Sequence, residues 1–528
     1  MRRRATVPQC ASSDCAACAA RLARVTCMAG ASSSSGEWSL RLLVMVLLLI
    51  WAPSAAVAQD CASSVTRKSV TVDYGSGSSL LVERSDDGVL RGLDVATHSE
   101  LWQFVPPEVL TATAHLGLMT DLTVLRFDAN GDDIIDKSSR DRIWIYFGLK
   151  RAGAFYYAID ITDRTPRVLW RQDATAVVGL GQAWSTPTLT RVRISGAIQN
   201  GEHFVLIVGG GLDGARLFML DAATGRLLWS AGSGSSADLV LSKMTAGIAA
   251  RVTAVDFEGD EYADRLYAAD VGGRLWKFDI WNGHEAASLV TGGVFAELST
   301  TTAGDARRFF NAPDVALARS RDGRAFLNVA IGSGDADDAL NASVQDRFYS
   351  LRDYDPFVKR TQSAYDAATP LRDTDLSGGA AGWSLDLTHP GEKVVADSLT
   401  VDGAVMFTTY EPSSPGGATS CEEEGVSRVY VIWLEDKSAV LDLNDDSKVT
   451  DDDRSAPLTQ TGIADGPRIE LPKTAKPAPP TSDPTTPADP GDPNEPSATR
   501  CLVGAEVLKH CVPIGRVLRT YWKRNTVN

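Results

Sequence analysis

Aromatic residues make up only 7% of this 528-residue sequence, whereas Gly (45) and Pro (24) are frequent. A chain with many turn formers and few large side chains does not fit a helical bundle. Positive charge is also scarce, because 52 Lys and Arg stand against 67 Asp and Glu, for a net charge of -15. Such an acidic surface repels phosphate backbones, so general nucleic-acid binding is not expected.

Patterns typical of enzymes are absent as well. The six His are scattered, with no HExxH pair, and no GxSxG nucleophile elbow occurs. Residues 209–214 match GxGxxG, but a hairpin strand is expected after them where dinucleotide binding needs a helix. The sequence therefore predicts no catalytic activity.

The apolar run from Leu42 to Ala52 is eleven residues long and follows Arg41. It is too short for a stable membrane anchor, and Ala56-Val57-Ala58 after it has the small-x-small pattern of a signal-peptidase site. We therefore interpret residues 1–58 as a signal peptide region of an exported protein that is not an integral membrane protein; a buried core helix is the alternative. We interpret residues 1–36 as an over-long start, with Met28 as the alternative first residue.

Four Cys follow the predicted cleavage site: Cys61, Cys421, Cys501 and Cys511. An even number in an exported protein favours disulfides over a zinc site, and four Cys allow three pairings. Cys501–Cys511 closes a short loop and is the first choice.

A unit of two strands and two tight turns recurs along the chain. Its markers are an Asp at the end of the second strand and, in most copies, a following Leu-Trp; the Asp residues are 94, 160, 221 and 279. Asp-Gly or Gly-Gly between alternating apolar residues predicts the hairpins. Weaker copies occur at 349–353, 383–386 and 429–433.

This period of about 58 to 66 residues, built from short strands, is typical of propeller blades. We expect an all-β, quinoprotein-like β-propeller of about seven blades over residues 59–471, with calcium-binding loop insertions; an array of β-sandwiches is the alternative. Residues 472–500 are rich in Pro and form a disordered linker. Residues 501–528 are expected to supply a strand at 517–522 that closes the propeller.

Two acidic segments share one spacing of oxygen-bearing side chains. The first has Asp128, Asn130, Asp132 and Asp136, and the second has Asp256, Glu258, Asp260 and Asp264, at relative positions 1, 3, 5 and 9. Calcium takes six to eight oxygens, so such a turn, with the carbonyl oxygen of Ile134 or Tyr262 at position 7, predicts a Ca²⁺ site. A solvated acidic turn is the alternative.

A third segment has an EF-hand-like arrangement of oxygens at positions 1, 3, 5, 9 and 12: Asp442, Asn444, Asp446, Thr450 and Asp453. Ser447 replaces the usual Gly at position 6, and Asp453 replaces the usual Glu at position 12. Calcium binding and an acidic surface loop are equally supported here.

A series of motifs resembles the PilY family, the type IV pilus tip-associated adhesins and biogenesis factors also called PilC. The motifs are LWQFVPP (101–107), RIWIYFG (142–148), YYAIDITD (156–163), WSTP (184–187), GGG (209–211), APDV (312–315), IGSGD (331–335), DRFY (346–349) and RTYW (519–522). They span residues 66–436, with a tail at 517–522.

The resemblance implies a modified seven-bladed propeller and a calcium loop linked to pilus extension and retraction. That role transfers most directly to Asp256, Glu258, Asp260 and Asp264, where Glu258 departs from the usual Asp or Asn. It further implies a non-enzymatic protein of the periplasm, outer-membrane surface and pilus tip (fimbrium), supporting pilus biogenesis, twitching motility and adhesion. Its partners would be minor pilins and a host or abiotic surface.

Two other functions remain open. The blade signature alone suggests a quinone-dependent periplasmic dehydrogenase, although the mature chain lacks a vicinal Cys pair. An outer-membrane assembly scaffold is also a propeller, but the missing lipobox at Cys61 argues against it.

Overall fold

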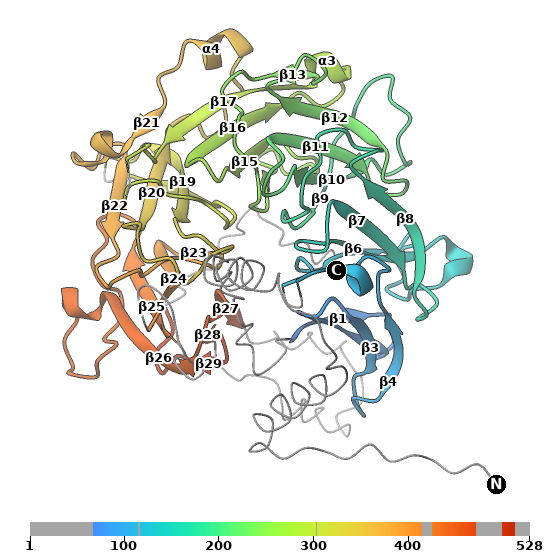
Figure 1. Ribbon diagram of the computed structural model, residues 1–528, viewed down its shortest axis with the longest axis horizontal. Coiled ribbons are helices and arrows are strands. Elements are labelled where there is room, and N and C mark those ends of the chain that lie inside the picture. Colours follow the sequence, from blue (N-terminus) through green and yellow to red (C-terminus); the bar gives the residue numbers. More distant parts are fainter. Residues whose placement is uncertain are drawn as a thin grey trace, which may run out of the picture. The chain divides into compact units, whose positions relative to one another are not determined.

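The computed structural model describes residues 67–114, 117–302, 304–320, 322–413, 425–470 and 499–512. All described residues lie in the second of the two units into which the chain divides, residues 60–528. This second unit contains seven sheets of mainly antiparallel strands, which follow one another in chain order around a common centre (Figure 1).

In each of the first three sheets, strands that are neighbours in the sheet are consecutive in the chain. They are β1 (Arg67–Asp73), β2 (Ser79–Ser85), β3 (Leu90–Asp94) and β4 (Glu100–Phe104); β5 (Thr123–Phe127), β6 (Arg142–Gly148), β7 (Phe155–Asp160) and β8 (Arg167–Asp173); and β9 (Thr188–Arg191), β10 (Phe204–Gly209), β11 (Arg216–Asp221), β12 (Leu227–Gly232) and β13 (Leu239–Val240).

The remaining four sheets follow the same order, with one strand added to the fourth from later in the chain. They are β14 (Thr253–Val255), β15 (Arg265–Ala269), β16 (Arg274–Ile280), β17 (Val290–Glu297) and β21 (Leu371–Arg372); β18 (Asp314–Arg319), β19 (Ala325–Gly332), β20 (Arg347–Asp353) and β22 (Gly382–Asp386); β23 (Leu399–Val401), β24 (Ala404–Glu411), β25 (Val426–Trp433) and β26 (Ser455–Thr461); and β27 (Pro467–Glu470), β28 (Arg500–Val503) and β29 (Glu506–Val507).

Helices are short and lie in the connections. They are the α-helices α3 (Ala286–Leu289) and α4 (Gln362–Asp366) and the 3-10 helices η1 (Val109–Thr111), η2 (Lys137–Ser139), η3 (Asp373–Leu376) and η4 (Asp451–Arg454). No helix in the described ranges combines the length and apolar character needed to cross a membrane.

The recurring Asp of the sequence closes a tight turn between two strands. The Asp221 carboxylate accepts hydrogen bonds from the backbone N–H of Ala223 and from the N–H and hydroxyl of Thr224, each at 3.0 Å. Gly225 follows with a φ of 69°, a conformation that costs Gly little. Asp94 makes the same contacts with the backbone N–H of Ala96 and with the N–H and hydroxyl of Thr97, so the repeated Asp marks a side-chain-stabilised turn.

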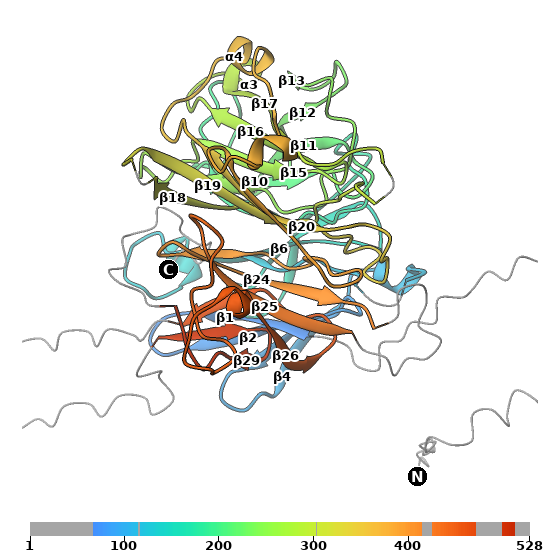
Figure 2. The same ribbon diagram turned by 90° about the vertical axis from the view of Figure 1, so that its left-hand side faces the viewer.

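The hydrophobic core consists of six clusters, and each cluster joins two consecutive sheets. Trp side chains of outer strands also reach the next sheet: Trp170 Nε1 donates to the carbonyl oxygen of Ala222 at 3.0 Å, and Trp383 Nε1 donates to that of Leu434 at 2.7 Å. The first and last sheets lie side by side in both views (Figures 1 and 2), where Lys68 Nζ is 2.7 Å from Asp465 Oδ1.

The predicted seven-bladed propeller is confirmed. Two of the weaker repeat copies, 349–353 and 383–386, are neighbouring strands of one blade, because β20 pairs with β22. The seventh sheet pairs β27 with β28 across residues 471–499, so the Pro-rich segment lies between two strands of one sheet. The predicted Cys501–Cys511 disulfide is present. The signal region, residues 472–498 and the predicted strand at 517–522 lie outside the described residues.

Candidate metal loops

The three acidic segments connect strands at the same end of their sheets. Residues 128–141 join β5 to β6, residues 256–264 join β14 to β15, and residues 442–453 lie between β25 and β26; we call these the first, second and third acidic loops. Since neighbouring strands are antiparallel, a connection from first to second strand and one from third to fourth emerge at the same end. The three loops therefore share one face of the propeller.

All three loops turn in the same way. Positions 4 and 6 of each loop have a left-handed backbone: Gly131 (φ 74°) and Asp133 (65°), Gly259 (77°) and Glu261 (71°), Asp445 (62°) and Ser447 (68°). Only Gly adopts this conformation without cost, and other residues lose about 1–2 kcal/mol. A shared and partly strained turn indicates that the rest of each loop enforces it.

The opening carboxylate of each loop enforces the turn from inside. Asp128 accepts from the N–H groups of Gly131 at 2.7 Å and Asp133 at 2.6 Å. Asp256 accepts from the equivalent groups of the second loop at 2.6 and 2.8 Å. Asp442 accepts from the N–H of Asp446 at 3.2 Å and, at position 6, from that of Ser447 at 2.7 Å.

Side chains at positions 3 and 5 are held by the same scheme. At position 5, the carboxylates of Asp132, Asp260 and Asp446 accept from the N–H at position 7 at 2.9, 3.0 and 2.8 Å, respectively. At position 3, the side-chain oxygens of Asn130 and Asn444 accept from the N–H two residues later at 3.0 and 2.9 Å. Glu258, at position 3 of the second loop, lies instead 3.7 Å from Lys359 Nζ. Position 7 is Ile134 in the first loop and Tyr262 in the second.

A buried carboxylate closes each loop from the far end. Asp264 accepts from the N–H groups of Phe257 and Glu258 at 3.0 and 3.1 Å, and Asp453 accepts from those of Leu443 and Asn444 at 3.2 and 3.3 Å. Asp453 also accepts from the Thr450 N–H at 2.8 Å and hydroxyl at 3.2 Å.

In the first loop the closing residue is Asp141, which the spacing argument missed. Its carboxylate accepts from the N–H groups of Ala129 and Asp136, both at 2.8 Å, and its side chain is buried. Asp136, the residue that the spacing selects, caps η2 and accepts from the Ser138 N–H at 2.9 Å. An Arg follows Asp141, Asp264 and Asp453 alike, so the Asp-Arg pair was the signal that could have found Asp141.

Hydrogen bonds keep several of these carboxylates ionised. Desolvation raises the pKa of Asp128, but hydrogen bonds from the backbone N–H groups of Asp133 and Gly131 lower it by more. The pKa of Asp128 therefore lies below its usual value. The pKa of Asp453 is lowered mainly by the backbone N–H of Thr450. The hydroxyl and N–H of Ser138 lower the pKa of Asp136. These groups therefore carry negative charge at neutral pH.

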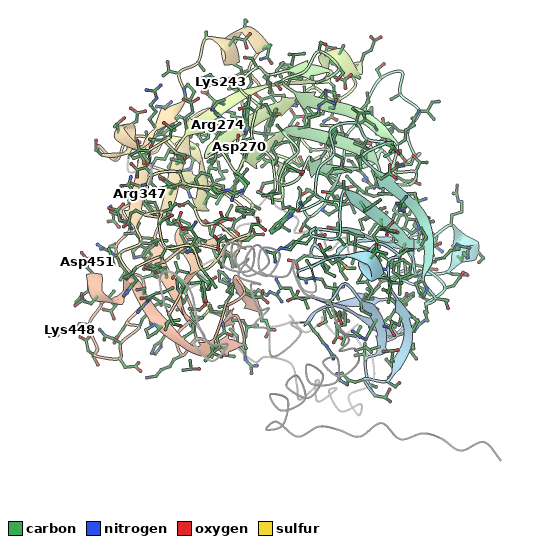
Figure 3. The ribbon with its side chains drawn as sticks, in the orientation of Figure 1. Lys243, Asp270, Arg274, Arg347, Lys448 and Asp451 are labelled. Atoms are coloured by element: carbon green, nitrogen blue, oxygen red, sulfur yellow. A yellow bond between two sulfur atoms is a disulfide. The ribbon has the colours of Figure 1, made fainter. Side chains whose placement is uncertain are left out.

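The residues fit an oxygen-preferring cation in donor type and in backbone turn, since EF-hand loops also need a sharp turn at position 6. Within the described ranges, however, no three His, Cys, Asp or Glu side chains already gather as a metal-binding cluster. In the first loop, the side-chain oxygens at positions 1, 3 and 5 that would contact an ion accept backbone hydrogen bonds within the loop. In Figure 3, Lys448 and Asp451 of the third loop lie at the periphery of the molecule.

Fold and loops together define a seven-bladed β-propeller with acidic turns on one face. No family model matches the chain. It is 26% identical over 359 residues to a type IV pilus biogenesis factor PilY1 homologue of Xylella fastidiosa, covering 62% of this chain and 27% of that protein. It is 27% identical over 203 residues to PilY1 of Pseudomonas aeruginosa strain UCBPP-PA14, covering 37% of this chain and 17% of that one.

Among solved structures, the chain matches the C-terminal domain of Pseudomonas aeruginosa PilY1 with a TM-score of 0.58 and 16% identity. The match covers 83% of this chain and 93% of that domain. The chain spans about a quarter or less of the length of these curated relatives. The chain is thus similar in sequence to PilY1 proteins and shares the propeller fold of the PilY1 C-terminal domain.

Proposed function

We propose that this protein is a non-enzymatic, exported factor of type IV pilus biogenesis. The observation that carries the proposal is the similarity to PilY1 proteins over 359 residues. The common propeller fold supports it, because that fold matches the PilY1 C-terminal domain over almost its whole length. Among the described residues, no feature favours a quinone-dependent dehydrogenase or an outer-membrane assembly scaffold over this role.

The finer part of the proposal concerns place and partners. The protein acts in the periplasm, at the outer-membrane surface and at the pilus tip, where it contacts minor pilins and a host or abiotic surface. In this role it supports twitching motility and adhesion.

The proposal includes Ca²⁺ at the acidic loops. Asp128, Asn130 and Asp132 with the carbonyl of Ile134, and Asp442, Asn444 and Asp446, would hold the ion in the first and third loops. Asp256, Glu258, Asp260 and Asp264 with the carbonyl of Tyr262 would do so in the second. Uncompensated carboxylates in one turn repel one another, so a divalent cation is a natural counter-charge. A bound ion would stiffen the face on which all three loops lie.

The test is a deletion strain complemented with the full-length gene. Loss of the protein should reduce surface piliation and twitching, and the wild-type gene should restore both. Complementation with Asp128→Ala, Asp256→Ala or Asp442→Ala should restore piliation only in part. Lys137→Met, a change within the first loop at a position that would not bind metal, serves as the matched control. Normal piliation and twitching in the deletion strain, with no second copy of the gene, would contradict the proposal.

A further inference from the structure

The second acidic loop differs from the other two because a lysine, Lys359, forms ion pairs with two of its carboxylates. Lys359 Nζ is 2.7 Å from Asp264 Oδ1 and 3.7 Å from Glu258 Oε1. It also lies 5.5 Å from the centre of the Phe257 ring. The Lys359 side chain is 16% exposed and that of Asp264 only 2%, so this ion pair is poorly screened by solvent. An ammonium group thus already offsets part of the negative charge of this loop.

Lys359 belongs to a long connection from the neighbouring blade, residues 354–381 between β20 and β22, which we call the strap. This connection runs from the third to the fourth strand of its sheet, so it begins on the face that carries the acidic loops. From there it returns to the fourth sheet, where β21 pairs in parallel with β17 and α4 packs beside them (Figure 1). The topology therefore carries a residue of the fifth blade to a loop of the fourth.

The strap is held on both sides of Lys359. Arg265 donates to the carbonyl oxygens of Asp355 at 2.8 Å and Val358 at 2.7 Å. On the other side, the Arg360 N–H donates to Asp279 at 2.8 Å, and the Thr291 hydroxyl donates to the Arg360 carbonyl at 2.6 Å. With the backbone fixed before and after it, Lys359 can leave Asp264 only by rotation of its own side chain.

The other two loops have no such cation at the positions that would bind metal. In the described residues, no Lys or Arg lies within 4.0 Å of the carboxylates of Asp128, Asp132, Asp442 or Asp446. Lys137, which lies within the first loop, pairs with Asp163 outside the loop. The three loops thus share a backbone but not a charge balance.

We propose that Lys359 is a built-in counter-cation of the second loop and competes with a divalent ion for Asp264 and Glu258. The inference rests on the calcium part of the proposed function. An ammonium is a compact, mobile point charge, so it can be displaced, but its presence repels a dication and occupies two of the ligand oxygens. The second loop should consequently bind Ca²⁺ more weakly than its oxygen donors alone would predict.

The test is calorimetric titration of the secreted full-length chain with CaCl₂. Asp128→Ala and Asp442→Ala together leave the second loop as the only intact one of the three. In this background, Lys359→Met keeps the apolar stem on Phe257 and removes the charge, and it should tighten Ca²⁺ binding at least tenfold, or about 1.4 kcal/mol. Lys359→Arg keeps the charge and should retain the weaker binding. Lys137→Met is the control and should change nothing.

A second readout separates competition from a purely structural role. In EGTA, the protein with Lys359→Met should melt at a lower temperature than the Asp128→Ala, Asp442→Ala background, because Asp264 is left buried without a partner charge. Ca²⁺ should then raise the melting temperature of the Lys359→Met protein more than that of the background. A lower melting temperature with unchanged Ca²⁺ affinity would show that Lys359 is only structural and would overturn the inference.

The two proposals can fail separately. Equal Ca²⁺ affinity in the background and in Lys359→Met would overturn the competition while leaving calcium at this loop intact. Absence of binding in both would overturn the competition together with calcium at the second loop, and the pilus role would still be judged by the deletion strain.

Discussion

Arg265→Met should be among the most damaging single substitutions in this chain. The Arg265 side chain is fully buried, and its Nε lies 2.7 Å from Asp279 Oδ1, which is fully buried as well. Its Nη1 is 3.4 Å from the buried Asp353. Two further bonds, at 2.8 and 2.7 Å, hold the strap carbonyls of Asp355 and Val358. One guanidinium thus joins two buried carboxylates and the strap.

The size of the effect follows from what remains after the change. Removing one partner of a buried ion pair costs about 3–5 kcal/mol, because the other charge stays buried. Asp353 keeps Lys277 Nζ at 2.6 Å, and Asp279 keeps the Tyr365 hydroxyl at 2.7 Å, so total loss of both carboxylate environments is not expected. For a chain of this size, 3–5 kcal/mol corresponds to a fall of about 3–5 °C in melting temperature.

Acid should reveal the same change. Burial raises the pKa of Asp353, but the charges of Lys277 and Arg265 outweigh it, so the pKa lies below its usual value. A depressed pKa contributes stability above the pKa of the unfolded chain, and that stability is lost as the pH falls through the folded pKa. Without Arg265 the folded pKa of Asp353 moves up, so acid unfolding should begin at a higher pH.

Urea unfolding and thermal melts of the secreted chain measure both effects. Arg193→Met is the matched control, because Arg193 is exposed. Its guanidinium lies 4.6 Å from the ring centre of Tyr262 in the second acidic loop, which directly precedes Arg265. The control should cost less than about 1 kcal/mol. If Arg265→Met costs no more than the control and leaves acid unfolding unchanged, the buried network does not stabilise the fold as argued.

Three shorter predictions concern other parts of the molecule. Burial raises the pKa of Asp346 to about 6, so the stabilising contribution of Asp346 is present below the unfolded pKa and is lost as the pH rises to about 6. In urea unfolding, Asp346→Asn should therefore increase the free energy of unfolding by about 2–3 kcal/mol at pH 7 and by little at pH 3.5. An equal gain at both pH values would contradict this. Replacing Cys501 and Cys511 by Ala opens a loop of ten residues in the seventh sheet and should cost about 2–3 kcal/mol, whereas an unchanged melting temperature would show that the sheet closes without the bond. Gly75→Ala places a methyl 2.0 Å from the backbone oxygen at position 6 of the first acidic loop and should lower the melting temperature by more than Gly77→Ala, whose added methyl meets nothing within 4 Å; equal effects would leave only the shared cost of a left-handed backbone.

The blades could be predicted because each depends on local signals. Asp221 and Gly225 make a turn within five residues, and Trp229 follows Asp221 at the same spacing as Trp102 follows Asp94, so the unit can be recognised in the sequence. The strap could not be predicted in this way. Its pairing of Leu371 with Ala296 joins residues 75 positions apart, and two residues in parallel pairing leave no periodic pattern.

The acidic loops show the same limit at the level of single residues. Positions 1 to 7 of each loop follow from spacing, because their hydrogen bonds join residues two to five apart. The closing carboxylate does not, since η2 is inserted before Asp141 and moves it thirteen residues from Asp128, against eight between Asp256 and Asp264. Spacing alone therefore selected Asp136.

A shared backbone does not imply a shared affinity. The turn at positions 4 and 6 is a property of each loop, but a cation near its carboxylates can come from a connection of another blade that emerges on the same face. For the second loop that connection is the strap, and Lys359 comes 95 residues after Asp264. For the third loop it includes Lys509, which contacts Asp445 at 2.6 Å, a position that would not bind metal. Because each propeller face is built from connections of successive blades, insertions in one blade can tune a site in its neighbour without changing any residue of that site. As Ca²⁺ is added, the first and third loops of this chain should therefore bind it before the second loop does. Lys359→Met should abolish this difference.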